Sequence, residues 1–283
     1  MDKCRVRVQC SVVLLTSALA AACLPPEWGA NALLHPTRHS FVVAADLPHQ
    51  DVSFRSDGLL LKGWFFRARE PRRGLIVYLH GVADNRSSAV GVARRFVPKG
   101  YDMLAYDSRA HGESEGEDCT YGFYEKRDLA RALDAVSADG AVLFGSSLGA
   151  AVALQAAPED PRVRGVIAQS SFSDLETVAR ERAPWFATRA DVDGAFAVAE
   201  RRAHFLIAAV SPREAAARIR VPVLLIHGLM DHETAPAHSR RIYRALAGPR
   251  QLLLVPDTGH NDVLGSEAVW RAIEAWLVAL TEA

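Results

Sequence analysis

The stretch Ala141-Val142-Leu143-Phe144-Gly145-Ser146-Ser147-Leu148-Gly149 joins a short apolar run to a segment of small residues, 150–157, that favours a helix. Its second half has the pattern Gly-x-Ser-x-Gly. Glycines on both sides of a serine permit unusual backbone angles and a close approach of neighbouring chain. The pattern therefore predicts that Ser147 lies on a sharp strand-to-helix turn, with its hydroxyl exposed above a sheet as a nucleophile requires.

Short apolar runs and helical patterns alternate along most of the chain. The runs are bounded by turn residues and cover residues 75–79, 103–106, 142–144, 166–168, 223–226 and 252–255. The helical patterns cover residues 87–97, 124–138, 149–157, 237–247 and 267–279. A hairpin, 52–55 and 59–66 around a turn at 56–58, is expected at a sheet edge. The order predicts an α/β fold with a mostly parallel central sheet and helices on both faces.

The segment from about 175 to 220 has no buried-strand pattern, but aromatic and aliphatic residues are spread among Arg and Ala. We expect it to form a small helical cap over the carboxyl ends of the strands, where it would shape a substrate pocket. The alternative is that its helices only complete the outer layer of the sheet.

Composition restricts the partners. Lys and Arg together number 33, as do Asp and Glu, so the 283-residue chain has no excess of charge to attract nucleic acid. Of four cysteines, only Cys119 follows residue 23, which leaves no intrachain disulfide in the main body. No cluster at metal-ligand spacing is evident, and no cofactor is predicted.

The first 23 residues are typical of an export signal. Lys3, Arg5 and Arg7 precede the apolar stretch 11–22, which is too short for a membrane span of about 20 residues. The run Leu19-Ala-Ala-Ala-Cys23 resembles a lipoprotein signal, so Cys23 could attach the protein to a membrane through a lipid. We expect an exported envelope or periplasmic protein, with an uncleaved anchor as the alternative. Residues 24–50 are predicted to be a lead-in, and 51–283 the main domain.

A serine nucleophile needs a base and an acid that orients the base. Asp231 follows the run 223–226 and His260 follows the last run, so both are expected at the carboxyl ends of strands beside Ser147. Asp174, after the run 166–168, is a rival for the acid. Catalysis of acyl transfer also needs oxyanion donors, and the backbone amides of Val82 and Leu148 are available by position. His80, His111 and His227 are expected to hold loops together.

These motifs resemble the α/β-hydrolases, in the bacterial group labelled serine aminopeptidase-like or BEM46-like. The resemblance covers roughly residues 34–280 and is carried by runs at 80–85, 106–114, 145–149, 227–231 and 259–260. It implies an α/β-hydrolase fold, the chain order Ser, Asp, His for the triad, and hydrolysis of esters, thioesters or amides. Ala110 departs from a glycine that is common in such proteins, which puts the geometry of its loop in question.

The function predicted from the sequence is a serine hydrolase that cleaves a carboxylic ester, or a thioester, of a small-molecule acyl substrate. Ser147, His260 and Asp231 would form the triad, and the amides of Val82 and Leu148 the oxyanion hole. A peptidase or amidase and an acyltransferase use the same triad and remain alternatives. A noncatalytic binding protein of the cell envelope is the alternative from another class.

Overall fold

The computed structural model of the chain describes residues 25–39 and 47–282. The predicted export segment, including Cys23, lies outside the described residues. Within those two ranges, none of the helices combines the length and the apolar character that a membrane span requires.

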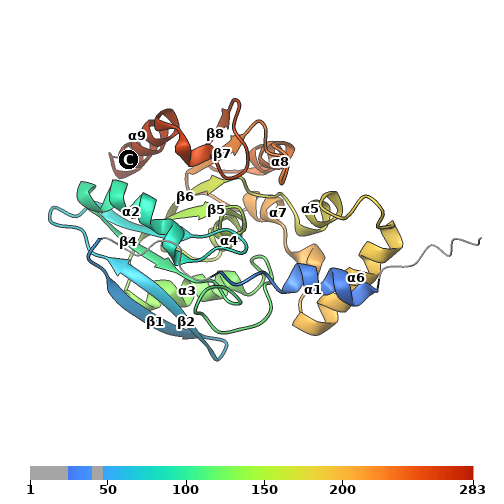
Figure 1. The fold of residues 1–283 in the computed structure, drawn as a ribbon. Helices are drawn as coiled ribbons and strands as arrows, with labels where there is room; N and C mark the ends of the chain where they lie inside the picture. Colours follow the sequence, from blue (N-terminus) through green and yellow to red (C-terminus); the bar gives the residue numbers. More distant parts are fainter. Residues whose placement is uncertain (1–24, 40–46, 283) are drawn as a thin grey trace, which may run out of the picture.

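Eight strands form one sheet in the order β1-β2-β4-β3-β5-β6-β7-β8 (Figure 1). The strands from β4 to β8 in this order run parallel, and β2 pairs antiparallel with both β1 and β4. The predicted edge hairpin is therefore confirmed, with Ser56 opposite Leu59. The bounds are β1 Gln50–Ser56, β2 Leu59–Phe66, β3 Gly74–Leu79, β4 Tyr101–Tyr106, β5 Ala141–Ser146, β6 Val163–Gln169, β7 Val223–Gly228 and β8 Arg250–Val255.

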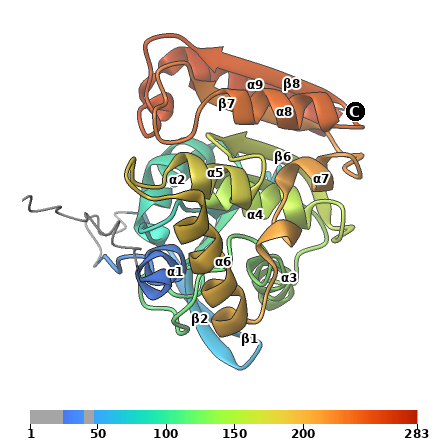
Figure 2. The ribbon, with the colours of Figure 1, turned by 90° about the vertical axis from the view of Figure 1, so that its right-hand side faces the viewer.

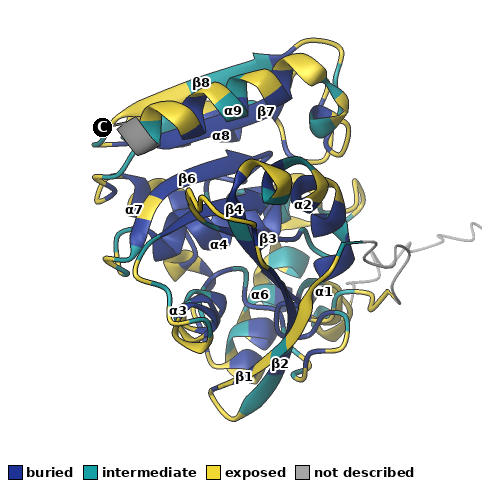
Figure 3. Ribbon diagram, turned by 90° about the vertical axis from the view of Figure 1, so that its left-hand side faces the viewer, coloured by how far each residue is buried: buried dark blue, intermediate teal, exposed yellow. Residues whose placement is uncertain are grey.

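Helices cover both faces of the sheet, as the alternating pattern predicted. One apolar core lies between the sheet and α3 (Glu125–Ala135), α4 (Leu148–Ala156) and α8 (Ala237–Ala245). A second lies between the opposite face and α2 (Val90–Phe96) and α9 (Glu267–Glu282). Figure 3 shows the central strands as buried and β1 as largely exposed at its edge. The α/β fold predicted from the sequence is confirmed.

The predicted helix at 87–97 is in fact three short pieces. The 3-10 helix η1 (Arg86–Ala89) precedes α2, and η2 (Val97–Lys99) follows it. Gly100, with φ of 95°, ends the run in a left-handed conformation that glycine adopts without strain. Two further 3-10 helices occur later, η3 (Ile207–Ala209) and η4 (Val263–Gly265).

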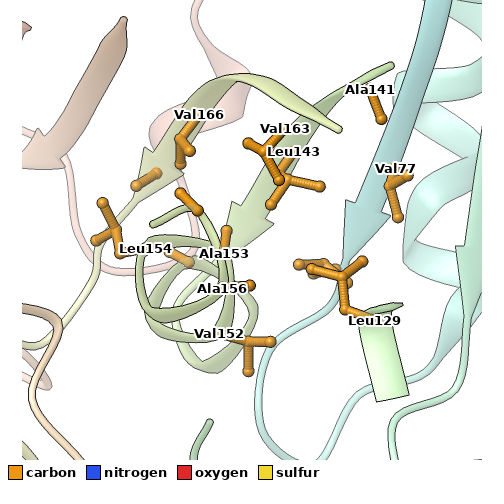
Figure 4. Packing of buried hydrophobic residues seen from close by; sticks show 14 of the residues in the cluster. Val77, Leu129, Ala141, Leu143, Val152, Ala153, Leu154, Ala156, Val163 and Val166 are labelled. Atoms are coloured by element: carbon orange, nitrogen blue, oxygen red, sulfur yellow. The ribbon is translucent and has the colours of Figure 1, made fainter. Parts of the chain in front are cut away.

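Helix α4 packs closely on the strands before and after it. In Figure 4 the side chains of Val152, Ala153 and Leu154 lie in the same apolar cluster as Leu143 on β5 and Val166 on β6. A β-carbon on Gly149 would lie 2.0 Å from the carbonyl oxygen of Leu79, and one on Gly145 would lie 2.3 Å from the backbone of Gly149. Both distances are far shorter than a van der Waals contact, so any side chain at these positions would push the helix off the sheet. The two glycines of the sequence motif therefore let the helix approach the sheet.

Beyond the sheet, α5 (Leu175–Glu181) and α6 (Arg189–Ala203) form a separate layer together with α1 (Pro26–Leu34) (Figure 2). Their buried residues form a third apolar core, which also contains Ala151, one turn beyond Ser147. Helix α1 falls in the segment expected to be only a lead-in; Pro26 at its start and Glu27 in its first turn were the available signals. Helix α7 (Pro212–Ala216), by contrast, contacts α4 and α8 in the sheet layer. We call α1, α5 and α6 the cap helices.

Candidate active site

Ser147 lies at the turn between β5 and α4 with φ of 50° and ψ of −109°. A non-glycine residue at positive φ is held there only when the surroundings over-determine the conformation. One such restraint is visible: the N–H of Ser147 donates to the carbonyl of Gln169 at the end of β6, at 2.8 Å. The backbone bend carries the side chain away from the strand and toward the loops that follow β7 and β8.

His260 and Asp231 meet Ser147 at this edge of the sheet. The Ser147 Oγ atom lies 3.0 Å from Nε2 of His260, and Nδ1 of His260 lies 2.7 Å from Oδ2 of Asp231. All three residues are buried, with 9%, 8% and 3% of the surfaces of Ser147, His260 and Asp231 exposed. In this arrangement Oγ–H donates to Nε2 and Nδ1–H donates to the carboxylate, which fixes the imidazole tautomer.

Asp231 is the most heavily bonded member of the group. Its Oδ1 accepts the backbone N–H groups of Glu233 at 3.0 Å and Thr234 at 2.8 Å. Burial alone would raise the pKa of this carboxyl. Hydrogen bonds with His227 and His260, followed by the bond with the Thr234 amide, outweigh burial and hold the pKa well below its usual range. The carboxylate is therefore ionised at neutral pH.

His227 is a member of this network that the sequence analysis treated only as a loop support. Its Nε2 lies 2.7 Å from the carbonyl of Thr234 and 3.1 Å from Oδ2 of Asp231, and both oxygens are acceptors. Nε2 therefore carries the proton, and Nδ1 accepts from Ser239 Oγ at 2.6 Å. His227 thus holds the loop and also touches the acid. The spacing of four residues between His227 and Asp231 after a buried strand was the signal for this contact.

The rival acid, Asp174, has another role. Its side chain accepts the N–H of Thr177 at 3.1 Å and caps the start of α5. Its other oxygen accepts from Ser173 Oγ at 2.7 Å. Among the described contacts of Asp174, none involves His260, whose Nδ1 faces Asp231.

The two amides predicted as oxyanion donors belong to segments that adjoin Ser147. Leu148 is the first residue of α4, where a helix leaves its N–H groups unpaired and carries a partial positive charge. Val82 follows Gly81, and a β-carbon on Gly81 would lie 3.7 Å from Cβ of Ser147. The loop after β3 therefore passes directly beside the serine. Nδ1 of His80 lies 2.7 Å from the Gly81 carbonyl, whose peptide carries the Val82 N–H.

The loop after β4 is hydrogen-bonded to the loop after β3 and helps to hold it beside Ser147. Asp107 accepts the N–H of Arg86 at 2.7 Å and of Glu113 at 2.8 Å and pairs with the Arg86 guanidinium, so it holds the turn in place. Nε2 of His80 accepts the N–H of Ser108 at 3.0 Å. Ala110, which replaces the glycine common in similar proteins, has φ of 64°. The loop therefore keeps the left-handed conformation without glycine.

No cluster of three or more His, Cys, Asp or Glu residues suited to a metal occurs within residues 25–39 and 47–282. A cavity of about 480 Å³ lies between the start of β4, η2 and α9, and its lining contains none of the three residues of the serine site.

The chain is similar to known proteins in sequence. The family model described as the alpha/beta hydrolase fold matches residues 74–216, half of the chain. The protein YfhR of Escherichia coli K12 is 29% identical over 216 residues, which cover 73% of this chain and 71% of YfhR.

Solved structures show the same fold. An esterase of Pyrococcus furiosus superposes with a TM-score of 0.70 at 20% identity, over 87% of this chain and 97% of the esterase. An acylaminoacyl peptidase of Pyrococcus horikoshii superposes with a TM-score of 0.64 at 16% identity, over 84% of this chain and 42% of the peptidase. The family match shows that the chain belongs to the α/β-hydrolase fold family, and the sheet order and the two structural likenesses agree with it.

Proposed function

We propose that the protein is a serine hydrolase that cleaves a carboxylic ester through an acyl-enzyme on Ser147. The observation that carries the proposal is the continuous hydrogen-bonded series from Ser147 Oγ through the imidazole of His260 to Asp231, with contacts of 3.0 and 2.7 Å. A buried, ionised carboxylate at one end and a strained serine at the other are what nucleophilic catalysis needs.

The reaction follows from these positions. Ser147 Oγ attacks the ester carbonyl while Nε2 of His260 takes the hydroxyl proton, and Asp231 stabilises the imidazolium. The N–H groups of Val82 and Leu148 bind the oxyanion, and each such donor contributes on the order of 3 kcal/mol to the transition state. The C–O bond then breaks, and His260 returns the proton to the leaving alcohol. A water molecule, deprotonated by His260, attacks the acyl-enzyme and releases the acid and free Ser147.

An ester is favoured by the likeness to the Pyrococcus furiosus esterase, which extends over nearly the whole of both chains. The likeness to the acylaminoacyl peptidase keeps amide hydrolysis as the second candidate. An amine is a poorer leaving group than an alcohol and must be protonated as the C–N bond breaks. The two candidates therefore differ in the relative rates of matched ester and anilide substrates. Thioester hydrolysis and acyl transfer would use the same acyl-enzyme.

The test is labelling of the full chain with a fluorophosphonate probe, followed by peptide mapping. We expect modification at Ser147 and none in Ser147→Ala. Ser146→Ala is the matched control, because it removes the neighbouring hydroxyl from the same turn, and it should label like the wild type. p-Nitrophenyl acetate and butyrate are then compared with N-acetyl-alanine p-nitroanilide. A folded wild-type protein that does not label would overturn the proposal in favour of a noncatalytic role.

A further inference from the structure

Three aromatic side chains are exposed on the cap helices and the loop that joins them. Trp185 and Phe186, between α5 and α6, have 95% and 56% of their surfaces exposed, and Trp28 on α1 has 68%. The rings of Trp185 and Phe186 pack edge-to-face against each other, with centroids 5.6 Å apart. We call Trp28, Trp185 and Phe186 the cap aromatic residues. Exposed large aromatics in such a group are unusual on a monomeric surface.

These residues share one side of the molecule. Helix α1 packs along α6, where Pro26 at the start of α1 faces Gly194 and a β-carbon on that glycine would lie 3.2 Å from the proline ring. The loop with Trp185 and Phe186 leads directly into α6. In Figure 1 the α5–α6 connection and the start of α1 lie at the side of the molecule away from the sheet, and in Figure 2 this side faces the viewer.

The chain that precedes α1 points to what this side contacts. The apolar stretch 11–22, which follows three basic residues, ends only four residues before Pro26. A stretch of this composition enters a lipid bilayer when it is retained, and a lipid on Cys23 would do so in its place. Because so few residues separate it from α1, a bilayer that holds this part of the chain must lie close to the start of α1. Trp28 lies on α1 itself, and the loop with Trp185 and Phe186 leads into α6, on which α1 packs.

Charge does not offer another explanation for the surface. Residues 175–210 contain five arginines and five carboxylates, and Arg180 is paired with Glu176 and Asp193. The cap therefore has no excess positive charge for an anionic partner. Tryptophan, with an apolar ring and one N–H donor, is the side chain that prefers the boundary between lipid headgroups and acyl chains.

We propose that the cap aromatic residues dock on a lipid bilayer, so that the cap side of the protein lies on the membrane. Docking is driven by the burial of aromatic surface in the interface and not by attraction to anionic lipid. It is therefore expected on phosphatidylcholine vesicles and is expected to persist when salt is raised. The proposal does not depend on the reaction at Ser147 and is tested without measuring activity.

The distribution of tryptophan makes the test direct. The chain has five tryptophans, of which Trp64, Trp270 and Trp276 are buried in the second core with 8% or less of their surfaces exposed. The full chain is bound to phosphatidylcholine vesicles that carry bromine on the acyl chains, and the quenching of tryptophan emission is measured. Bromine can reach only Trp28 and Trp185, so quenching should occur in the wild type and be absent from the Trp28→Phe, Trp185→Phe double variant.

A second pair of variants separates docking from anchoring. An anchored N-terminal segment alone would keep Trp28 near the bilayer, so docking is read from Trp185 in the Trp28→Phe background. There Phe186→Asp should remove the quenching of Trp185 while the N-terminal segment still holds the chain on the vesicle; Phe186→Leu is the matched control and should leave the quenching unchanged. Before vesicles are added, acrylamide should quench Trp28 and Trp185.

Three results would overturn the proposal. The first is vesicle-bound protein without quenching from Trp28 or Trp185, or no binding at all. The second is protection from acrylamide without vesicles, which would mean that the chain's own N-terminal segment covers the cap. The third is a vesicle-free dimer that dissociates in the Trp185→Asp, Phe186→Asp variant, which would make a second copy the occupant.

Discussion

Oδ2 of Asp231 lies 2.7 Å from Nδ1 of His260 and, on its other side, 3.1 Å from Nε2 of His227. One carboxylate oxygen is therefore shared by the imidazole that faces Ser147 and by one that faces the protein interior. Both contacts favour the ionised carboxyl, and the pKa of Asp231 is held low despite its burial.

Replacement of this acid should slow the nucleophile. In Asp231→Asn the side chain presents an amide that cannot stabilise an imidazolium, so the rate of fluorophosphonate labelling at Ser147 should fall by a factor on the order of 10³ to 10⁴. Asp174→Asn is the matched control because asparagine caps a helix about as well as aspartate. It should label at the wild-type rate. If Asp174→Asn lost labelling and Asp231→Asn kept it, the acid would be Asp174.

Gly149 is expected to be essential for folding. In Gly149→Ala the new methyl group would lie 2.0 Å from the Leu79 carbonyl, so α4 must move away from the sheet. The free energy of unfolding should fall by several kcal/mol, in the upper range of about 3 to 5 kcal/mol for single substitutions. Gly91→Ala, at an exposed helical position where a β-carbon meets nothing within 4 Å, should instead be neutral or stabilise by about 0.5 to 1 kcal/mol. Denaturation in urea measures both; equal effects would contradict the close-approach argument.

Arg109 and Asp128 form a buried bidentate ion pair, with contacts of 2.7 Å from Nε and 2.6 Å from the second guanidinium nitrogen. Arg109→Met would leave the Asp128 carboxylate buried without its partner and should cost about 3 to 5 kcal/mol of stability. The matched control is Arg131→Met, which breaks the largely exposed pair with Asp134 and should cost under about 1 kcal/mol. Urea midpoints and slopes give both values, and similar losses would show that burial does not decide the cost.

Acid should destabilise the protein in part through His111. Burial first, and then the neighbouring His80, lower the pKa of His111 to about 3, so the folded protein keeps the ring neutral. The unfolded chain protonates it near its ordinary pKa of about 6.5. Stability contributed by the neutral ring is therefore complete above pH 6.5 and is lost as pH falls from there toward 3.

The contribution can be isolated by comparison with His111→Asn, which does not titrate. Between pH 7 and pH 5 the wild type should lose about 2 kcal/mol more than the variant does, whatever their difference at pH 7. Urea unfolding at the two pH values measures this. An equal pH slope in the two proteins would mean that His111 titrates alike in its folded and unfolded states.

The order of apolar runs and the Gly-x-Ser-x-Gly pattern were enough to predict the fold class and the local form of the nucleophile turn. The short, unbroken apolar runs indicate buried parallel strands. A strand that is covered on both faces has apolar residues throughout and no alternation of apolar and polar residues. The glycines at 145 and 149 indicate a helix packed tightly on its strand, and the structure places their α-carbons against neighbouring backbone. The positions of Ser147, Asp231 and His260 after three strands also indicated one edge of the sheet, because parallel strands end together.

Which side chains are in contact, by contrast, is seen only in the folded chain. The contact of His227 with Asp231 depends on how the loop after β7 folds back. Asp174 could be set aside as the acid only because the structure shows its side chain capping the start of α5. Helix α1 was missed because its helical signals are weak and its stability comes from packing on α6, far away in the sequence. Contacts of this kind are set by distances between segments that no local pattern records, and so they appear only once the chain is folded.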